Sequence, residues 1–167
     1  MKQSKLEKYA RKMLETRGVT INDIAELVYY LQSPYHDDLT LELCKENVEK
    51  VLTKREIQNA MITGIQLDML AEKKLLDEPL QSIIETDEGL YGVDEIIAFS
   101  IINVYGSIGF TNYGYIDKQK PGILKKLNDK STGEVHTFLD DIVGAIAAAA
   151  SSRLAHSYES ESNEEDE

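Results

Sequence analysis

Cysteine, basic side chains and long apolar runs are all scarce in this sequence of 167 residues. The single cysteine, Cys44, excludes an intrachain disulfide, and its apolar neighbours favour a buried core residue over a reactive thiol. No segment reaches the roughly 20 uninterrupted apolar residues that a membrane-spanning helix needs. The opening residues lack the apolar centre of a secretory signal. These absences predict a cytoplasmic protein.

Positive charge is also in short supply, since 18 Lys and Arg face 30 Asp and Glu and the formal net charge is −12. Half of that excess lies in residues 157–167, which hold six acids and no base. This composition predicts an acidic disordered tail, so we expect a single domain over residues 1–156. Because nonspecific nucleic-acid binding needs a basic surface, the charge argues against a nucleic-acid partner.

No stretch alternates between polar and apolar residues with the period of two that a half-buried strand requires, and apolar residues instead recur at helical spacing. The pattern predicts helices over residues 4–16 and 20–31, more than one helix over 39–76, a short helix over 78–84, and further helices that begin near Gly92 and Thr137. Thr20 and Asp23 have the spacing of a capping box. We therefore expect an all-α fold.

Small residues and charge suggest where several of these helices bend or end. Gly64 predicts a bend or a close helix crossing. Gly106, Gly109 and Gly114 predict that the segment after the Gly92 helix is a loop. The last helix is expected to end near His156, where the acidic segment begins.

Two pairs of adjacent acids each open an otherwise apolar segment. Asp94 and Glu95 precede one such segment, and Asp140 and Asp141 precede the other. A carboxylate that faces a packed interior is costly unless it is paired or binds a metal, and two together resist joint ionisation. We interpret the four acids as ligands of a shared divalent cation. Their oxygen donors favour Mg²⁺, or Mn²⁺, over zinc.

Helix capping is the structural alternative for these acids. Thr137 and Asp140 have the spacing of a capping box, in which Asp140 only satisfies backbone N–H groups, and Asp94 lies in the first turn of its helix. Capping accounts for one acid of each pair and leaves Glu95 and Asp141 unexplained. Because consecutive helical residues diverge by about 100°, Asp140 and Asp141 should point in different directions.

The basic part of the chain, residues 117–130, lies between the two acidic pairs. A lysine binds phosphate as a point charge, and a metal site beside a lysine is what phosphate-ester hydrolysis requires. Lys120 is the catalytic candidate, whereas Lys125, Lys126 and Lys130 fit a solvated helix face. Whether further residues join the same site stays open as well, and the candidates are Glu56, Asp68, His36, Asp37 and Asp38.

Three blocks of sequence resemble the phosphatidylglycerophosphatase A family, and most closely its soluble branch of low-temperature-requirement C, or YutG-like, proteins. The blocks are residues 92–98 (GVDEIIA), Lys120-Pro121 with Ile123 and a following Asp129, and Gly133 leading to residues 139–144 (LDDIVG). The resemblance implies a compact bundle with a central helix surrounded by others. It also implies a Mg²⁺-dependent phosphatase that converts phosphatidylglycerophosphate to phosphatidylglycerol. By residue, it suggests metal ligands at Asp94, Glu95, Asp140 and Asp141, and a phosphate contact at Lys120. We predict that Asp94, Asp141 and Lys120 are the catalytic residues.

The membrane-bound members of that family carry hydrophobic spans, which this chain lacks. Both a phospholipid and a small soluble phosphate ester therefore stay open as substrates. A peripheral position at the inner face of the membrane stays open too, although an anionic bilayer repels an acidic protein. Abundant apolar residues favour a homo-oligomer. The competing interpretation is a non-enzymatic helical scaffold, or a regulatory protein with a vestigial metal site, because no Gly-rich phosphate loop and no nucleophile-plus-base signature is present.

Overall fold

The structure, a computed structural model, describes residues 3–165, with side chains as far as residue 160. Its elements are α1 (Lys5–Thr16), α2 (Ile21–Gln32), α3 (Leu41–Leu52), α4 (Arg55–Glu72), α5 (Leu80–Thr86), α6 (Val93–Ile102), η1 (Asn103–Tyr105), α7 (Ile108–Gln119), α8 (Ile123–Leu127), η2 (Lys130–Thr132) and α9 (Leu139–Glu165). No strand occurs among the described residues, which confirms the all-α fold class. In the same part of the chain, no helix is both long enough and apolar enough to cross a membrane.

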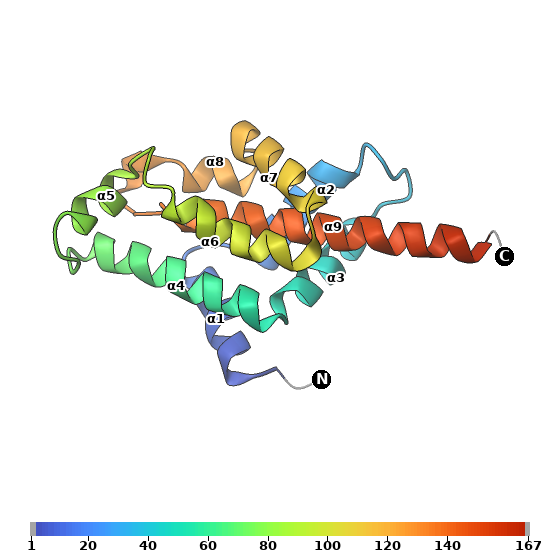
Figure 1. The fold of residues 1–167 in the computed structure, drawn as a ribbon, viewed down its shortest axis with the longest axis horizontal. Coiled ribbons are helices and arrows are strands. Elements are labelled where there is room, and N and C mark those ends of the chain that lie inside the picture. The colour runs from blue at the N-terminus through green and yellow to red at the C-terminus, as the bar shows by residue number, and fades with distance from the viewer. Residues whose placement is uncertain (1–2, 166–167) are drawn as a thin grey trace.

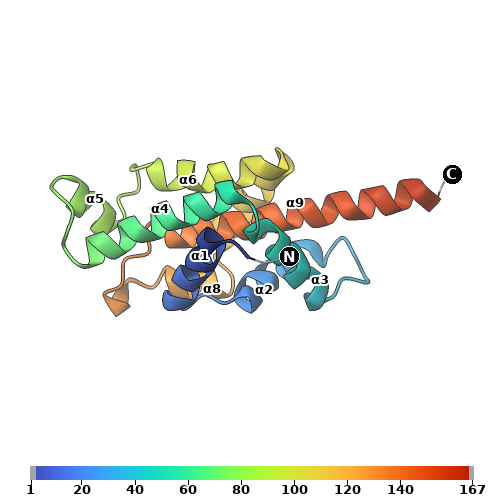
Figure 2. The same ribbon diagram turned by 90° about the horizontal axis from the view of Figure 1, so that it is seen from below.

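Helix α9 forms the axis of the molecule (Figures 1 and 2). It packs against α2, α3, α4, α6, α7 and α8, which confirms the predicted bundle around a central helix. Residues 139–152 are buried without interruption. A helix that is apolar on every side belongs in a core, and the alanines at 147–150 let the surrounding helices approach closely.

Side-chain caps fix where the N-terminal helices begin. Ser4, Thr20 and Thr40 each accept a hydrogen bond from a backbone N–H group three residues further on. Thr20 and Asp23 complete the predicted capping box. Cys44 lies fully buried in α3, where burial raises the pKa of its thiol to about 11. This confirms its interpretation as a core residue.

Helix α4 crosses α9 very closely at Gly64. A Cβ atom at Gly64 would lie 2.5 Å from Ile142 Cδ1 and 3.0 Å from Phe138 Cβ. Real Cβ contacts are longer than this, so a side chain there would force Ile142 to move or the two helices to separate. The crossing confirms the expectation for Gly64, and it sets the first turns of α9 against the middle of α4.

Two expected boundaries differ from the structure. The glycine-rich segment after α6 is helix α7 and not a loop, because Gly109, Tyr113 and Ile116 pack into the core beside α9 and this packing outweighs low helix propensity. Helix α9 continues to Glu165, where we expected it to end near His156. The predicted domain boundary at residue 156 thus falls inside α9 and stays a prediction, and residues 166–167 of the predicted tail lie outside the described residues.

Candidate active site

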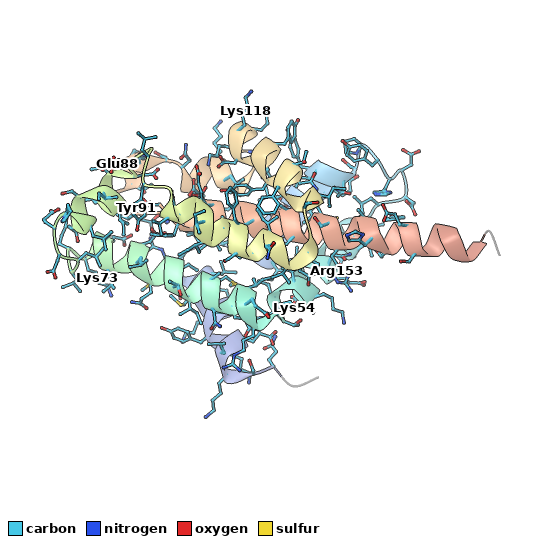
Figure 3. The ribbon with its side chains drawn as sticks, in the orientation of Figure 1. Lys54, Lys73, Glu88, Tyr91, Lys118 and Arg153 are labelled. Atoms are coloured by element: carbon cyan, nitrogen blue, oxygen red, sulfur yellow. The ribbon has the colours of Figure 1, made fainter. Side chains whose placement is uncertain are left out.

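Three of the four predicted acids meet near the N-terminal end of α9. Asp140 and Asp141 lie in the first turn of α9, and Asp94 lies in the first turn of α6, which packs along α9. Their exposed fractions are only 8%, 7% and 9%, and the interaction with Asp141 influences the pKa of Asp94. Tyr91, labelled in Figure 3, lies three residues before Asp94, in the connection that leads into α6. Glu95 is exposed, and its role as a ligand stays a prediction.

Lys120 reaches the site from the end of α7. It follows the last helical residue in a left-handed conformation with φ 48°. Its Nζ atom lies 3.1 Å from Asp140 Oδ2 and 2.5 Å from Asp117 Oδ1. Burial disfavours the charge on Lys120, but attraction to Asp140 and Asp117 outweighs it, so the pKa of Lys120 is raised above its usual value. The ammonium group therefore remains charged at physiological pH.

The carboxyl groups in this cluster resist ionisation. Burial is the main cause and raises the pKa of Asp141 to about 9, with further contributions from the charges of Asp140 and Asp94. Burial also raises the pKa of Asp140 to about 6, although Lys120 opposes that shift. Without a cation, the cluster therefore holds protons that a divalent cation would displace.

Tyr113 belongs to the site and was missed by sequence reasoning. Its hydroxyl donates a hydrogen bond to Asp141 Oδ1 over 3.0 Å, and burial together with nearby negative charge raises the pKa of Tyr113. Asp87 and Asp117 were missed as well, and their charges contribute to the raised pKa values of Asp140 and Asp141, respectively. These residues reach the site only through packing, and Tyr113 lies in the segment that we expected to be a loop.

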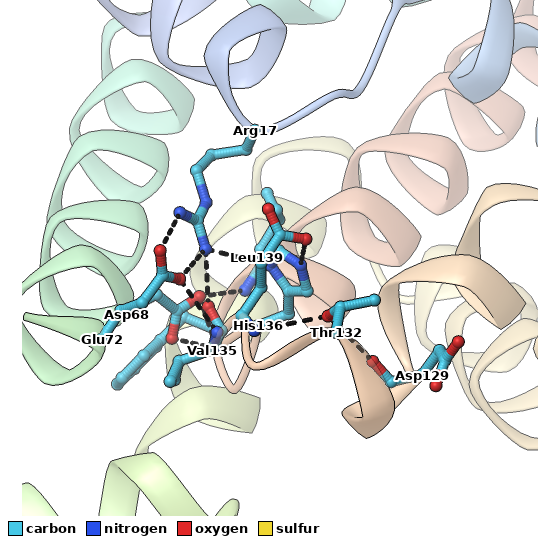
Figure 4. A network of polar contacts seen from close by, with 10 residues as sticks. Arg17, Asp68, Glu72, Asp129, Thr132, Val135, His136 and Leu139 are labelled. Carbon is cyan, nitrogen blue, oxygen red and sulfur yellow. Dashed lines mark hydrogen bonds and ion pairs between the residues drawn. The ribbon is translucent and has the colours of Figure 1, made fainter.

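A buried acid from α4 caps α9 (Figure 4). Asp68 is fully buried, and its carboxylate accepts hydrogen bonds from the backbone N–H groups of Phe138 (3.0 Å) and Leu139 (2.9 Å). Burial raises the pKa of Asp68 despite these two donors. The reciprocal capping box considered for Thr137 and Asp140 is wrong, because the Thr137 hydroxyl donates to a backbone carbonyl of α5. Asp140 does accept a backbone hydrogen bond, from the N–H group of Asp141 over 2.8 Å. The cap of α9 is thus supplied from 70 residues away.

An ion pair holds the segment before α9 beside this cap (Figure 4). Arg17 Nη2 lies 2.7 Å from Glu72 Oε2 and 2.9 Å from the carbonyl oxygen of Val135. Glu72 Oε2 in turn accepts a hydrogen bond from the Val135 N–H group over 3.0 Å. The ends of α1 and α4 therefore fix the chain immediately before Asp140 and Asp141.

A cavity of about 260 Å³ opens beside Asp140. Its walls come from the ends of α4, α5 and α8 and from the approach to α9. Lys74 and Asp87 in the wall, with Lys120 in the site, have positive φ angles of 59°, 52° and 48°. No other non-glycine residue in the described chain has a positive φ. Such strain costs about 1–3 kcal/mol per residue and concentrates at functional sites.

The other candidate ligands do not join the site, apart from Asp68 as a cap. His36, Asp37 and Asp38 belong to the connection between α2 and α3. The His36 ring stacks on Tyr158 at 3.9 Å, and the Tyr158 hydroxyl donates to Asp38 over 3.2 Å. These contacts lie near the far end of α9. Glu56 is exposed in the first turn of α4.

The donor chemistry of the site fits a hard divalent cation. In the part of the chain that the structure describes, no three Asp, Glu, His or Cys side chains are already gathered as a complete ligand set. Asp94, Asp140 and Asp141 nevertheless offer only oxygen donors, which Mg²⁺ prefers. Burial raises the pKa values of all three carboxyl groups, so the positive charge of a bound cation would favour their joint ionisation.

Fold and site together define a helical-bundle protein with a buried carboxylate cluster facing a charged lysine. The chain belongs to the phosphatidylglycerophosphatase A family, whose model matches residues 10–156. It is 70% identical over 153 residues to the uncharacterized protein YutG of Bacillus subtilis (strain 168), covering 92% of each. Membership of this family suggests phosphatase-like activity.

Solved structures share the whole fold. The low temperature requirement C protein from Listeria monocytogenes is 70% identical and superposes with a TM-score of 0.93, covering 95% of this chain and 99% of that one. Protein ypjQ from Bacillus subtilis is 57% identical, with a TM-score of 0.90 over 96% of this chain and 99% of its own.

Proposed function

We propose that this chain is a Mg²⁺-dependent phosphatase, with Mn²⁺ as the alternative metal. In the proposed reaction, water and phosphatidylglycerophosphate, or a related phosphate monoester, give phosphatidylglycerol, or the corresponding alcohol, and phosphate. The observation that carries this proposal is the convergence of Asp94, Asp140 and Asp141 beside Lys120. The family supports the reaction class, and the site supplies the charges that phosphate transfer to water requires.

Asp94, Asp140 and Asp141 would hold the cation. When bound, the cation supplies the positive charge that a phosphate ester needs among three carboxylates that would otherwise repel it. Asp68 and the Arg17–Glu72 pair keep Asp140 and Asp141 in place by fixing the start of α9.

Lys120 binds and orients the phosphate group. Its ammonium is a compact charge that carries three donors, and the contacts to Asp117 and Asp140 fix its position. Tyr113 orients Asp141 through their hydrogen bond. Because burial raises the pKa of Asp141 to about 9, cation binding releases a proton and becomes stronger as pH rises.

The alternative is a protein that binds a cation but no longer hydrolyses its ligand, or a scaffold that does neither. The lack of a preassembled group of three ligands among the described residues favours this alternative. Metal titration and phosphate release together separate the three cases.

The test measures phosphate release from phosphatidylglycerophosphate and from soluble monoesters, with and without Mg²⁺. We expect Mg²⁺-dependent release by the native chain. Asp141→Asn should abolish it while the fold persists, because an amide resembles the protonated acid that burial favours. Asp37→Asn is the matched control, since Asp37 is exposed and lies outside the site.

Three results would contradict parts of the proposal. Unchanged turnover of Asp141→Asn at saturating Mg²⁺ removes Asp141 from the mechanism. Stoichiometric Mg²⁺ binding by calorimetry, without phosphate release from any substrate, would support the alternative of a regulatory protein. Absence of both Mg²⁺ binding and phosphate release would support the non-enzymatic scaffold.

A further inference from the structure

The cavity of about 260 Å³ shares Asp140 with the carboxylate cluster. Asp140 Oδ2 lies 3.1 Å from Lys120 Nζ, so a phosphate group bound by Lys120 has this cavity beside it, on the Asp140 side. An ester bound in this way can extend its alcohol part past Asp140 into the cavity. The cavity is smaller than the roughly 300–1,000 Å³ of pockets that take drug-sized ligands. It therefore suits a small alcohol.

The wall of the cavity is mostly polar. Its apolar side chains are Ala71, Leu127 and Val135, and most of the other lining residues carry charged or hydrogen-bonding groups. One of them, Asn128, is exposed, and its side-chain amide has no hydrogen-bond partner among the described residues. An amide both donates and accepts hydrogen bonds. Hydroxyl groups can replace the water on such a wall, whereas an apolar group would displace that water without restoring its hydrogen bonds.

Both lysines of the wall already have an acidic partner. Lys74, just beyond the end of α4, is ion-paired with Glu85 of α5. Lys130 Nζ in η2 lies 3.1 Å from Asp87 Oδ2. These two ion pairs tie the end of α4 and η2 to the region of α5, and so they fix the shape of the cavity. They also leave no unpaired lysine or arginine among the described lining residues to bind an anionic group of a ligand.

Acids outnumber bases in the wall. Asp129 and His136, both labelled in Figure 4, belong to it, as does Glu134. Asp129 accepts a backbone hydrogen bond, and Glu134 contacts the His136 ring at 3.2 Å. Neither acid is paired with a lysine or arginine in the described chain. A carboxylate or a second phosphate on the ligand is therefore repelled, whereas a neutral hydroxyl group is not.

We propose that this cavity binds the alcohol part of a small, soluble phosphate monoester whose alcohol is a neutral polyol such as glycerol. The inference rests on the proposed phosphatase function and narrows its substrate. In the reaction, water attacks phosphorus and the P–O bond to the alcohol breaks. The alcohol oxygen takes up a proton, and the phosphate keeps the oxygen of the water. Phosphatidylglycerophosphate suits the cavity less well, because its glycerol carries a second, anionic phosphate and then two acyl chains.

The test compares kcat/KM, in the presence of Mg²⁺, for three soluble esters and for phosphatidylglycerophosphate in detergent micelles. Glycerol 3-phosphate supplies the neutral polyol. In 3-phosphoglycerate a carboxylate replaces one hydroxymethyl group, and in butyl phosphate the alcohol is apolar. We expect kcat/KM for glycerol 3-phosphate to exceed each of the other three values at least about tenfold.

Two variants of the wall test which groups set this preference. Glu134→Lys reverses a charge on an exposed side chain, and it should lower the preference for glycerol 3-phosphate over 3-phosphoglycerate several-fold, because lysine attracts the carboxylate. Asn128→Leu removes the free amide, and it should lower the preference over butyl phosphate several-fold. Each preference is a ratio of two kcat/KM values for one protein, so a change in the amount of folded protein cancels.

The matched control is Glu46→Lys, which makes the same charge reversal at an exposed position of α3. Helix α3 lies away from α5 and the end of α4 in both views of the ribbon (Figures 1 and 2). The preferences of this variant should equal those of the native chain.

Binding is measured separately from turnover by calorimetry with phosphonate analogues of glycerol 3-phosphate and 3-phosphoglycerate. In these analogues a methylene group replaces the ester oxygen, so they cannot be hydrolysed. The native chain and Glu46→Lys should bind the polyol analogue more tightly than the carboxylate analogue, and Glu134→Lys should reduce this difference several-fold.

The outcomes separate this inference from the proposed function. If phosphate is released but phosphatidylglycerophosphate, 3-phosphoglycerate or butyl phosphate is hydrolysed as well as glycerol 3-phosphate, the function stands and the assignment of the cavity is wrong. Equal preferences of Glu134→Lys and Glu46→Lys also overturn the assignment. If the polyol analogue binds with the expected selectivity but no ester is hydrolysed, the cavity is a ligand site and the phosphatase function is contradicted. If neither analogue binds, the assignment is wrong whatever the activity.

Discussion

The Tyr113 hydroxyl donates a hydrogen bond to Asp141 Oδ1 over 3.0 Å and joins α7 to the first turn of α9. Both side chains are buried, with exposed fractions of 5% and 7%. The bond favours the ionised form of Asp141 against the effects of burial and of the neighbouring acids. Tyr113 therefore orients the carboxylate and limits the rise of its pKa.

Tyr113→Phe should lower phosphatase activity about ten- to a hundredfold. A hydrogen bond to a charged group contributes about 1.5–3 kcal/mol, and its removal raises the pKa of Asp141 further. Because the carboxylate must be ionised to bind a cation, the rise of activity with pH should move to higher pH. Steady-state rates over a pH series with soluble ester and Mg²⁺ would measure both effects.

Tyr115→Phe is the matched control on the same helix. Tyr115 is 52% exposed, and its hydroxyl lies 3.5 Å from that of Tyr30. The rate and pH profile of the Tyr115→Phe variant should match those of the native chain. A Tyr113→Phe variant with the native pH profile would show that Tyr113 does not act on Asp141.

Asp68→Ala should destabilise the fold by about 3 kcal/mol. It leaves the buried N–H groups of Phe138 and Leu139 without their acceptor, at about 1–3 kcal/mol for each unsatisfied group. Asp68→Asn keeps one carbonyl oxygen and should cost about 1 kcal/mol. Urea unfolding followed by circular dichroism measures both free energies.

The control for this cap is Asp23→Ala. Asp23 belongs to the partly exposed capping box of α2, so its loss should cost no more than about 1 kcal/mol. Equal stability of Asp68→Ala and the native chain would contradict the role of Asp68 as the cap of α9.

Acid should remove the contribution of the Arg17–Glu72 pair. The hydrogen bond from Arg17 holds the pKa of Glu72 below its usual value of 4.5. The pair therefore stabilises the fold fully above about pH 4.5, and this contribution is lost as pH falls through the lower pKa of the folded state. Glu72→Gln should lower the free energy of unfolding by about 1 kcal/mol at pH 7, allowing for solvent screening.

The difference in the free energy of unfolding between Glu72→Gln and the native chain should shrink when urea unfolding is repeated below pH 4. Glu49→Gln breaks a more exposed ion pair, with Arg11, and should cost about 0.5 kcal/mol or less at pH 7. A gap between native and Glu72→Gln chains that stays constant from pH 7 to pH 3 would contradict this assignment.

The sequence pattern predicted much of the fold because its signals are local. Helical periodicity identified the elements, and the apolar residues that follow Asp140 and Asp141 marked α9 as the buried helix. Lys120 and the paired acids stood out because charge beside apolar residues is costly. Residues of this kind can be recognised from the few residues that surround them in the sequence.

The remaining parts of the site depend on partners that are distant in sequence. Asp68 caps a helix that begins about 70 residues later, and nothing near it in the chain indicates this. Tyr113 was missed because its glycine-containing segment favours a loop until packing on α9 is included. Thr137 illustrates the converse, since a correct capping-box spacing is overridden by a hydrogen bond to α5.

Gly64→Ala should destabilise the fold although alanine is the better helix former. The new methyl group would lie 2.5 Å from Ile142 Cδ1, and such overpacking costs about 1–3 kcal/mol. The gain in helix propensity is only about 1 kcal/mol. Gly114→Ala on α7 is the control, because its Cβ would meet nothing within 4 Å. That variant should be stabilised by up to about 1 kcal/mol in urea unfolding. If both variants gain stability, α4 and α9 do not cross as closely as described, and the start of α9 has room to move.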